Sequence, residues 1–164
     1  MIKYIHGDLL DTDAGFIVQQ VNCRGVMGSG VAAQIKRKYP FVFETYKKAC
    51  DAFGSDLLGQ YQFVRDEKTG VIILNLFAQD GYGRDPNTVY TRYDAFEKAL
   101  TGAREVVLDP YRHRVWGGQP PRNNRIAFPY KIGCGLGNGD WDSVILPMIE
   151  RILSDFEVEI YKLS

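Results

Sequence analysis

The chain has 164 residues, the length of one domain, so we expect a single domain spanning 1–164. Its 20 basic residues balance its 20 acidic ones, which argues against a general nucleic-acid binder with a basic excess. Three cysteines without a CxxC spacing and only two histidines indicate neither a disulfide scaffold nor a metal site, and we expect no cofactor. Without a signal-peptide pattern or an apolar run of about 20 residues, we expect a cytoplasmic protein with no membrane partner.

Hydrophobic periodicity predicts strands and helices that alternate along the chain. In chain order they are strands at 2–6 and 16–21, helices at 31–39 and 41–53, strands at 59–64 and 71–77, a helix at 89–108, a strand at 125–130, a helix at 141–154 and a strand at 158–163. This alternation is typical of α/β domains. We therefore predict three α/β/α layers around a central mixed, mostly parallel sheet of about six strands.

Residues 109–124 interrupt this pattern. They contain Pro110, Pro120 and Pro121, two adjacent glycines and several arginines, so we predict an extended loop or insertion. Long loops inside compact domains are often functional. His113 lies within it, and although a solvated loop histidine is the simpler interpretation, the segment could close over a ligand as a lid.

Two glycine-rich segments each connect a predicted strand to a predicted helix. Loop one, residues 22–30, reads Asn-Cys-Arg-Gly-Val-Met-Gly-Ser-Gly, and loop two occupies residues 133–139. Ligands of parallel sheets bind at the carboxyl ends of strands, and helix N-termini favour phosphate. The glycines of a single loop would be explained by turns and helix ends. Two such loops favour a ligand that carries phosphate, held from opposite sides, although neither loop has a dinucleotide or P-loop signature.

Short segments spread over nearly the whole chain are similar to the macro domain family, which binds ADP-ribose and processes its derivatives. In family order they are residues 7–9 (Gly-Asp-Leu), 21–22 (Val-Asn), 27–32 (Met-Gly-Ser-Gly-Val-Ala), 132–136 (Ile-Gly-Cys-Gly-Leu) and 158–161 (Val-Glu-Ile-Tyr). The stretch from Asn22 through Pro40, with Tyr46, Cys50, residues 53–55 and residues 57–59, is especially similar to the branch of ADP-ribose 1″-phosphate phosphatases.

The resemblance implies contacts for each part of ADP-ribose. Asp8 would accept a hydrogen bond from the adenine amine, with the backbone of Leu9 alongside, and Tyr161 would stack on the adenine. Simpler interpretations are a turn cap for Asp8 and core packing for Tyr161. Asn22 would lie near the distal ribose. The diphosphate and its neighbouring ribose would contact Gly28, Ser29, Gly30 and Val31 of loop one and Gly133, Cys134, Gly135, Leu136 and Gly137 of loop two.

The chain departs from the family's hydrolases at several positions. Many of them carry a second asparagine shortly after the first, where residues 23–25 here read Cys-Arg-Gly. A lysine-dependent branch has its lysine near Gln79 or Asp80 and an aspartate at the position of Gly137. We therefore do not predict the lysine-dependent mechanism, and a displaced pair, Lys131 with Asp140, would need a different loop geometry.

The catalytic candidates that remain near the distal ribose are Asn22, Asp80 and Asp140, with Arg24 as an anion clamp. Asp140 precedes a helix and is better explained as its N-cap, whereas a turn role and a catalytic role are evenly matched for Asp80. The first hypothesis is a monomeric hydrolase that acts on an ADP-ribose derivative at a 1″-phosphate or acyl ester, with de-ADP-ribosylation of a macromolecule as a variant. The second is a reader that binds ADP-ribose or an ADP-ribosylated partner without turnover. A third, weaker hypothesis is a phosphate-binding or nucleotide-sensing module.

Overall fold

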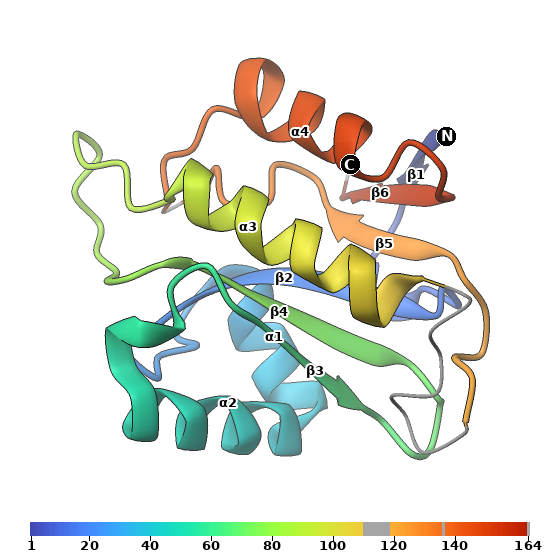
Figure 1. The fold of residues 1–164 in the computed structure, drawn as a ribbon, viewed down its shortest axis with the longest axis horizontal. Coiled ribbons are helices and arrows are strands. Elements are labelled where there is room, and N and C mark those ends of the chain that lie inside the picture. Colours follow the sequence, from blue (N-terminus) through green and yellow to red (C-terminus); the bar gives the residue numbers. More distant parts are fainter. Residues whose placement is uncertain (110–118, 136, 164) are drawn as a thin grey trace.

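The computed structural model describes residues 1–109, 119–135 and 137–163. Its strands form one sheet in the order β1-β6-β5-β2-β4-β3 (Figure 1). Neighbouring strands are parallel except β3 and β4, which are antiparallel. The strands are β1 (Ile2–His6), β2 (Phe16–Asn22), β3 (Tyr61–Arg65), β4 (Ile72–Gln79), β5 (Ile126–Pro129) and β6 (Val158–Lys162). The predicted mixed, mostly parallel six-stranded sheet is confirmed.

Helices cover both faces of this sheet, which confirms the three layers (Figure 1). They are α1 (Gly30–Lys38), α2 (Pro40–Phe53), α3 (Tyr93–Ala103) and α4 (Leu146–Ile152), the last preceded by a π-helical turn, Trp141–Ile145. Alternate residues of β2 point to opposite faces. Phe16 and Val18 pack with α3 and α4, whereas Ile17 and Val21 pack with α1 and α2. The apolar run of β2 therefore serves two cores at once.

The predicted helix at 89–108 begins later than its sequence pattern suggested. Tyr90 and Thr91 donate their N–H groups to the Gly137 carbonyl, at 2.9 and 3.1 Å, and Arg92 donates to the Ala78 carbonyl at 2.7 Å. These long-range hydrogen bonds hold the backbone extended until α3 starts at Tyr93. Tertiary contacts have overridden local propensity here.

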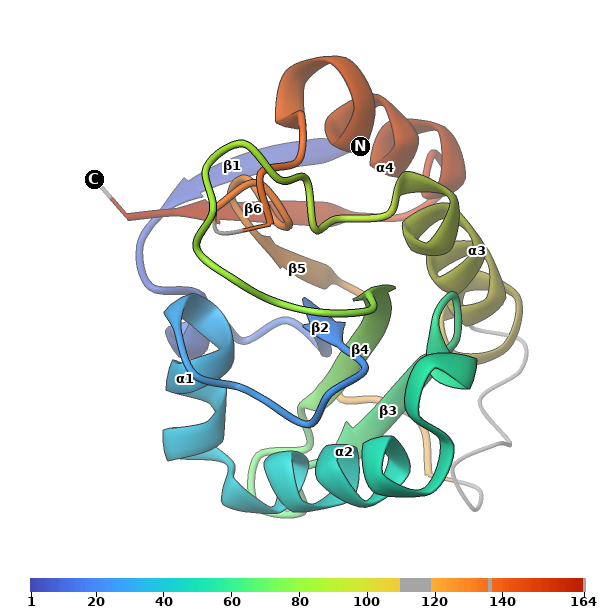
Figure 2. The same ribbon diagram turned by 90° about the vertical axis from the view of Figure 1, so that its left-hand side faces the viewer.

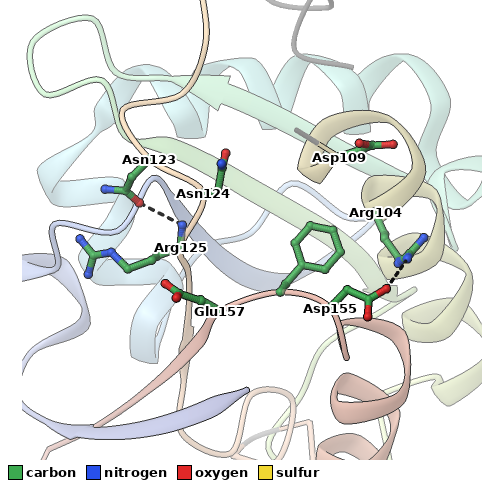
Figure 3. Close-up of a pocket in the computed structure, with 8 residues that line it drawn as sticks. Arg104, Asp109, Asn123, Asn124, Arg125, Asp155 and Glu157 are labelled. Atoms are coloured by element: carbon green, nitrogen blue, oxygen red, sulfur yellow. Dashed lines mark hydrogen bonds and ion pairs between the residues drawn. The ribbon is translucent and has the colours of Figure 1, made fainter. Parts of the chain in front are cut away.

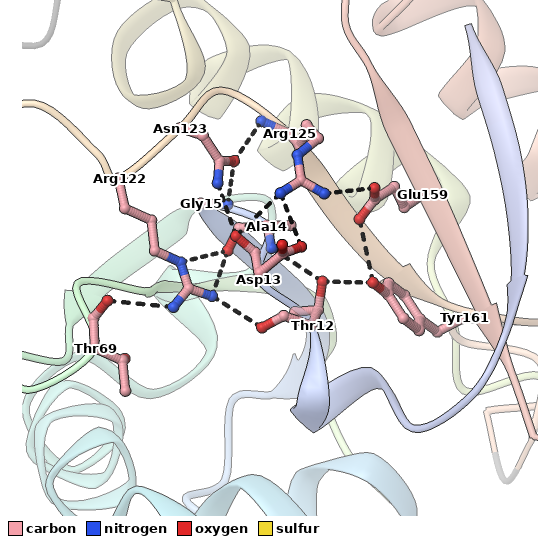
Figure 4. A network of polar contacts seen from close by, with 10 residues as sticks. All are labelled: Thr12, Asp13, Ala14, Gly15, Thr69, Arg122, Asn123, Arg125, Glu159 and Tyr161. Carbon is pink, nitrogen blue, oxygen red and sulfur yellow. Dashed lines mark hydrogen bonds and ion pairs between the residues drawn. The ribbon is translucent and has the colours of Figure 1, made fainter.

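The described flanks of the 109–124 segment lie at the amino edge of the parallel strands, opposite the glycine loops. The Arg122 guanidinium donates to the carbonyls of Thr12, Ala14 and Thr69, at 2.7 to 3.2 Å (Figure 4). Asn123 Oδ1 accepts the N–H of Gly15 at 2.7 Å. Residues 119–124 therefore join the chain segments that lead into the strands. His113, and with it the lid hypothesis, lies outside the described residues.

In the described part of the chain, no helix is long and apolar enough to cross a membrane. None of its groups of His, Cys, Asp and Glu has three members close enough to hold a metal ion.

Candidate functional site

A cleft of about 930 Å³ opens at the carboxyl ends of β2, β4 and β5. Four segments line it: the end of β2, loop one with the first turn of α1, the end of β4 with residues 82–84, and residues 129–133 with Gly135 and Gly137 of loop two. Figure 2 shows the segments that follow these strands at the strand ends that face the viewer. Ligand pockets of proteins are commonly about 300 to 1,000 Å³. The cleft is thus large enough for a nucleotide-sized molecule.

Asn22 ends β2 and organises loop one. Its Oδ1 accepts the N–H of Arg24 at 2.9 Å and the hydroxyl of Tyr46 at 2.8 Å, and its Nδ2 donates to the Val26 carbonyl at 2.8 Å. The side chain is buried and lines the cleft. Its amide is largely committed to holding the loop, which makes Asn22 a positioning residue in this geometry.

Loop one leads into α1, whose N-terminus lies at the cleft. Ser29 occupies the N-cap position but makes no side-chain capping hydrogen bond. The first-turn N–H groups of a helix have no partner within the helix and carry its positive dipole end. Gly28, Ser29, Gly30 and Val31 all line the cleft, and their contacts with a ligand stay predictions. This edge of the cleft suits an anion.

The glycines of loop two serve two different purposes. A Cβ at Gly133 would lie 2.6 Å from Gln20 Oε1, and one at Gly137 would collide with the Thr91 hydroxyl, so these glycines allow tight packing of the protein against itself. Gly135 lacks a positive φ and its Cβ position faces open space. Among the described glycines of loop two, Gly135 is therefore the one that neither backbone conformation nor packing requires. Leu136 lies outside the described residues.

Residues 85–91, between β4 and α3, clamp loop two, and the sequence analysis missed them. The Thr91 hydroxyl donates to the Gly133 carbonyl at 2.6 Å and accepts from Gln20 Nε2 at 2.9 Å. Asn138 Nδ2 donates to the carbonyls of Asp85 and Thr88, at 3.0 and 2.7 Å. No motif signals these contacts, because each joins residues that are far apart in sequence.

Of the charged side chains that the structure describes, Arg84 and Lys131 line the cleft, and both are cations. Asp80 lies outside the lining, where its Oδ1 accepts the Ser55 hydroxyl at 2.6 Å and its Oδ2 is 3.5 Å from Arg24 Nη2. The structure therefore places Asp80 in a latch between β4, loop one and the turn after α2. The Arg24 charge, predicted as an anion clamp, is offset by the same carboxylate.

Asp140 also lies outside the cleft lining. Its Oδ1 accepts the Ser143 N–H at 3.0 Å and so caps the helical turn at 141–145. The structure thus brings Asn22 to the cleft but brings neither candidate carboxylate there.

Asp8 follows β1 and Tyr161 lies on β6, the two strands at the edge of the sheet opposite β3. Asp8 Oδ1 accepts the N–H of Leu10 at 3.0 Å and caps a short 3₁₀ turn, Leu9–Asp11, in which Leu9 is buried. The Tyr161 hydroxyl is hydrogen-bonded with Thr12 Oγ1 at 2.7 Å and with Glu159 Oε1 at 3.3 Å (Figure 4). Both side chains thus have structural partners, and their contacts with adenine stay predictions.

Two cysteines lie in the loops. Cys23 follows Asn22, and Cys134, a predicted ligand contact, lies in loop two. Burial raises the pKa of each thiol to about 11. Because the thiolate is the nucleophilic form, neither cysteine is activated for nucleophilic chemistry at neutral pH.

A second hollow, of about 750 Å³, lies at the amino edge (Figure 3). Several of its polar groups bind one another or nearby strands, such as Arg104 with Asp155 at 3.7 Å and Arg125 with Glu159 at 2.9 Å. Asp109, the last described residue before position 119, also lines it.

Comparisons with known proteins agree with this geometry. A family model described as Macro domain matches residues 18–147. A DNA ADP-ribosyl glycohydrolase of Thermus aquaticus is 43% identical over 165 residues, covering 99% of this chain and 41% of that protein. An ADP-ribose 1″-phosphate phosphatase of Meyerozyma guilliermondii is 28% identical over 156 residues, covering 86% of this chain and 88% of that protein.

Among solved structures, the macrodomain of Mycobacterium tuberculosis DarG has a TM-score of 0.71 and 32% identity, with 100% of this chain and 99% of that chain covered. The chain spans less than half the length of the Thermus aquaticus glycohydrolase, and its match to the DNA ADP-ribosyl glycohydrolase of Mycobacterium bovis, over 50 residues, covers 14% of that protein.

Proposed function

Since this chain belongs to the Macro domain family, we propose that it binds ADP-ribose in the cleft between loops one and two and hydrolyses an ADP-ribose derivative. The bond broken is at the distal ribose. The group released from the distal ribose is phosphate, an acyl group or the macromolecule to which ADP-ribose was attached. The names of two relatives include two of these, DNA and a 1″-phosphate.

The single observation that carries this proposal is the cleft itself. It combines the uncapped N-terminus of α1, the open face of Gly135 and two cations, and these features together suit a diphosphate. The strand order then gives the ligand a direction. Asp8, just after β1, and Tyr161, on β6, lie beyond β5, so adenine would lie on that side and the distal ribose toward β4.

Hydrolysis at the distal ribose requires an oriented water and stabilisation of the charge that develops on the leaving group. The backbone N–H groups of α1 and the side chain of Arg84 would supply the electrostatic part. A base role for Asp80 would require its carboxylate to leave Arg24 and Ser55, because both of its oxygens are engaged.

A reader without turnover is the second candidate, and a specific observation favours it. Among the described residues of the cleft lining there is no carboxylate, histidine or cysteine to act as a base or nucleophile. The cleft would then recognise the ADP-ribose unit on a partner and leave the bond intact.

Calorimetry with ADP-ribose, followed by chromatography of reactions with ADP-ribose 1″-phosphate, O-acetyl-ADP-ribose, ADP-ribosylated protein and ADP-ribosylated oligonucleotide, tests both candidates. We expect ADP-ribose to bind and at least one derivative to release free ADP-ribose. Binding without release from any derivative would establish the reader. Absence of ADP-ribose binding would refute both.

A further inference from the structure

Gln19 is a polar residue in the middle of the buried strand β2. It is 1% exposed, yet it borders the cleft. Its side chain lies on the same face of β2 as those of Ile17 and Val21, which is the face that α1 and α2 cover. A buried amide is costly unless its N–H and C=O groups are hydrogen-bonded. The partners of Gln19 therefore decide whether this position has a structural role only.

A row of amides crosses the sheet from Gln19 and fixes the direction of its side chain. Gln19 Nε2 donates to Asn75 Oδ1 of β4 at 2.7 Å, and Asn75 Nδ2 donates to Gln62 Oε1 of β3 at 3.0 Å. Gln62 Nε2 then donates to the backbone carbonyl of Thr45 in α2 at 3.4 Å. Because a backbone carbonyl only accepts, this row gives each amide one orientation. Gln19 thus turns its NH₂ group toward Asn75 and its Oε1 atom away from the row.

Gln19 Oε1 is buried and has no hydrogen-bond partner among the residues that the structure describes. Most buried polar atoms of proteins have a partner, and an unpaired one lowers stability. Gln20 Oε1 also lacks a partner, but Gln20 lies on the opposite face of β2 against loop two, where a Cβ at Gly133 would be 2.6 Å away. Support of loop two explains the place of Gln20. For Gln19 Oε1, the cleft is the side from which a donor can come.

The part of the cleft beside Gln19 is apolar. Four apolar residues line the cleft with it: Val21, Val31, Ala32 and Pro129. Val31 and Ala32 of α1 pack against the same hydrophobic cluster that contains Val21. Ligand pockets typically combine apolar walls with a few placed polar groups that give specificity. An apolar wall with one unpaired acceptor suits the flat base or the ribose of a nucleoside.

The strand register sets Gln19 on the expected adenine side of the cleft. β2 pairs with β5 at Ile17 and Ala127, and two residues further along, this register sets Gln19 level with Pro129. Pro129 pairs with Tyr161 of β6, the residue that the resemblance assigns to adenine. Tyr161 packs against the same hydrophobic cluster as Ile17 and Ala127, so Gln19 and Tyr161 lie on one face of the sheet. Gln19 therefore faces the adenosine half of an ADP-ribose ligand.

We propose that Gln19 Oε1 accepts a hydrogen bond from the adenosine half of the ligand, which makes Gln19 a specificity-determining residue of this chain. This inference rests on the proposed function and concerns the same cleft. Two donors of adenosine could form the bond: the base amine or a ribose hydroxyl. In either case the amide row, which begins at α2, holds the acceptor in place before the ligand binds.

The test compares the affinity for ADP-ribose with that for three analogues, measured by calorimetry. Inosine diphosphate ribose carries a carbonyl in place of the base amine, and 2′-deoxy- and 3′-deoxy-ADP-ribose each lack one hydroxyl of the adenosine ribose. Wild-type protein should bind the analogue without the donor about fivefold or more weakly, because that ligand leaves the buried acceptor unpaired. Gln19→Met, of similar length but without an acceptor, should reduce this preference for ADP-ribose by the same factor.

Two further variants separate specificity from structure. Gln19→Glu keeps an oxygen acceptor at the same place and should retain the preference. Gln60→Met makes the same change as the test variant at an exposed position outside the cleft lining and should leave all affinities unchanged. The preference is a ratio of affinities for one folded protein, so a loss of stability alone does not alter it. Urea unfolding checks that each variant is folded.

The analogue whose discrimination depends on Gln19 identifies the donor as the amine or a hydroxyl. Unchanged ratios for all three analogues in Gln19→Met overturn the role of Gln19 and leave the proposed function standing. A preference that is lost in Gln19→Glu as well also overturns it, because the acceptor is still present there. A wild type that does not bind ADP-ribose overturns the proposed function and this inference with it.

Discussion

At the scale of single residues, glycine has several different roles in one cleft. Gly30 has a φ of +58° that an L side chain rarely adopts, and Gly133 combines a φ of +75° with crowding by Gln20. Substituting either residue would change the protein as well as the ligand site. Gly135 has neither constraint, so ligand contact can be tested there without disturbing the fold.

We predict that Gly135→Val lowers ADP-ribose affinity by about tenfold or more, because overpacking at a close contact commonly costs about 1–3 kcal/mol. The free energy of unfolding should change by about 0.5 kcal/mol or less, as for a typical surface position. Calorimetry and urea unfolding measure the two quantities. Gly135→Ala is the graded control, with a smaller loss of affinity. Unchanged binding in the valine variant would remove Gly135 from the site.

At the scale of elements, the segment at 85–91 shapes loop two before any ligand arrives. Thr91, which is 3% exposed, is the link between Gln20 of β2 and the Gly133 carbonyl. A loop that is ordered in advance loses less conformational entropy on binding. Loop one, loop two and the segment between β4 and α3 therefore form the binding edge of the sheet together, and the two glycine loops are not independent.

We predict that Thr91→Val, which keeps the shape and removes the hydroxyl, lowers ADP-ribose affinity about tenfold, because it removes the two hydrogen bonds by which Thr91 orders loop two, each worth about 0.5–1.5 kcal/mol. Backbone amides of loop two should exchange hydrogen faster in the free variant and regain protection when ADP-ribose binds. Thr91→Ser should restore both values. Normal exchange of loop two in Thr91→Val would contradict the clamp.

At the scale of the whole molecule, the two edges of the sheet have different tasks. The carboxyl edge carries the cleft, whereas arginines and amides at the amino edge join the segments that lead into the strands. Arg125 contacts both Glu159, at 2.9 Å, and Asp13, at 2.8 Å, and so ties β5 to β6 and to the turn before β2. Stability and ligand binding are thus largely separated in space.

The whole fold should lose stability at alkaline pH. Burial raises the pKa of Cys23 from an ordinary value of 9.0 to about 11, and it also raises that of Tyr46. A group whose pKa is raised in the folded state stabilises the fold below its unfolded pKa and loses that contribution as pH rises toward the folded value. The relevant window for Cys23 is therefore pH 9 to about 11.

We predict that the free energy of unfolding falls by about 1 kcal/mol between pH 8 and pH 10 because of Cys23 alone, since one pKa unit corresponds to about 1.4 kcal/mol. Urea unfolding at both values measures this change. Cys23→Ala should reduce the pH-dependent loss by that amount, whatever its effect on stability at pH 8. An identical loss in the variant would show that Cys23 does not titrate in this range.

The sequence by itself determined the order of elements, the α/β class and the position of both glycine loops. These features follow from local patterns: the β-branched run of β2, the proline that separates α1 from α2, and glycines placed directly after buried strands. The family resemblance also rested on short contiguous segments, and the family model that matches residues 18–147 confirms it.

The tertiary structure alone decided which residues face the cleft. The sequence left catalysis and a turn role evenly matched for Asp80, and the latch with Arg24 and Ser55 appears only once β4, loop one and the turn after α2 meet. The start of α3 and the role of Thr91 likewise depend on hydrogen bonds to loop two, about 40 residues later in the chain. The reason is physical: such contacts depend on how distant segments pack, and local periodicity does not record that packing.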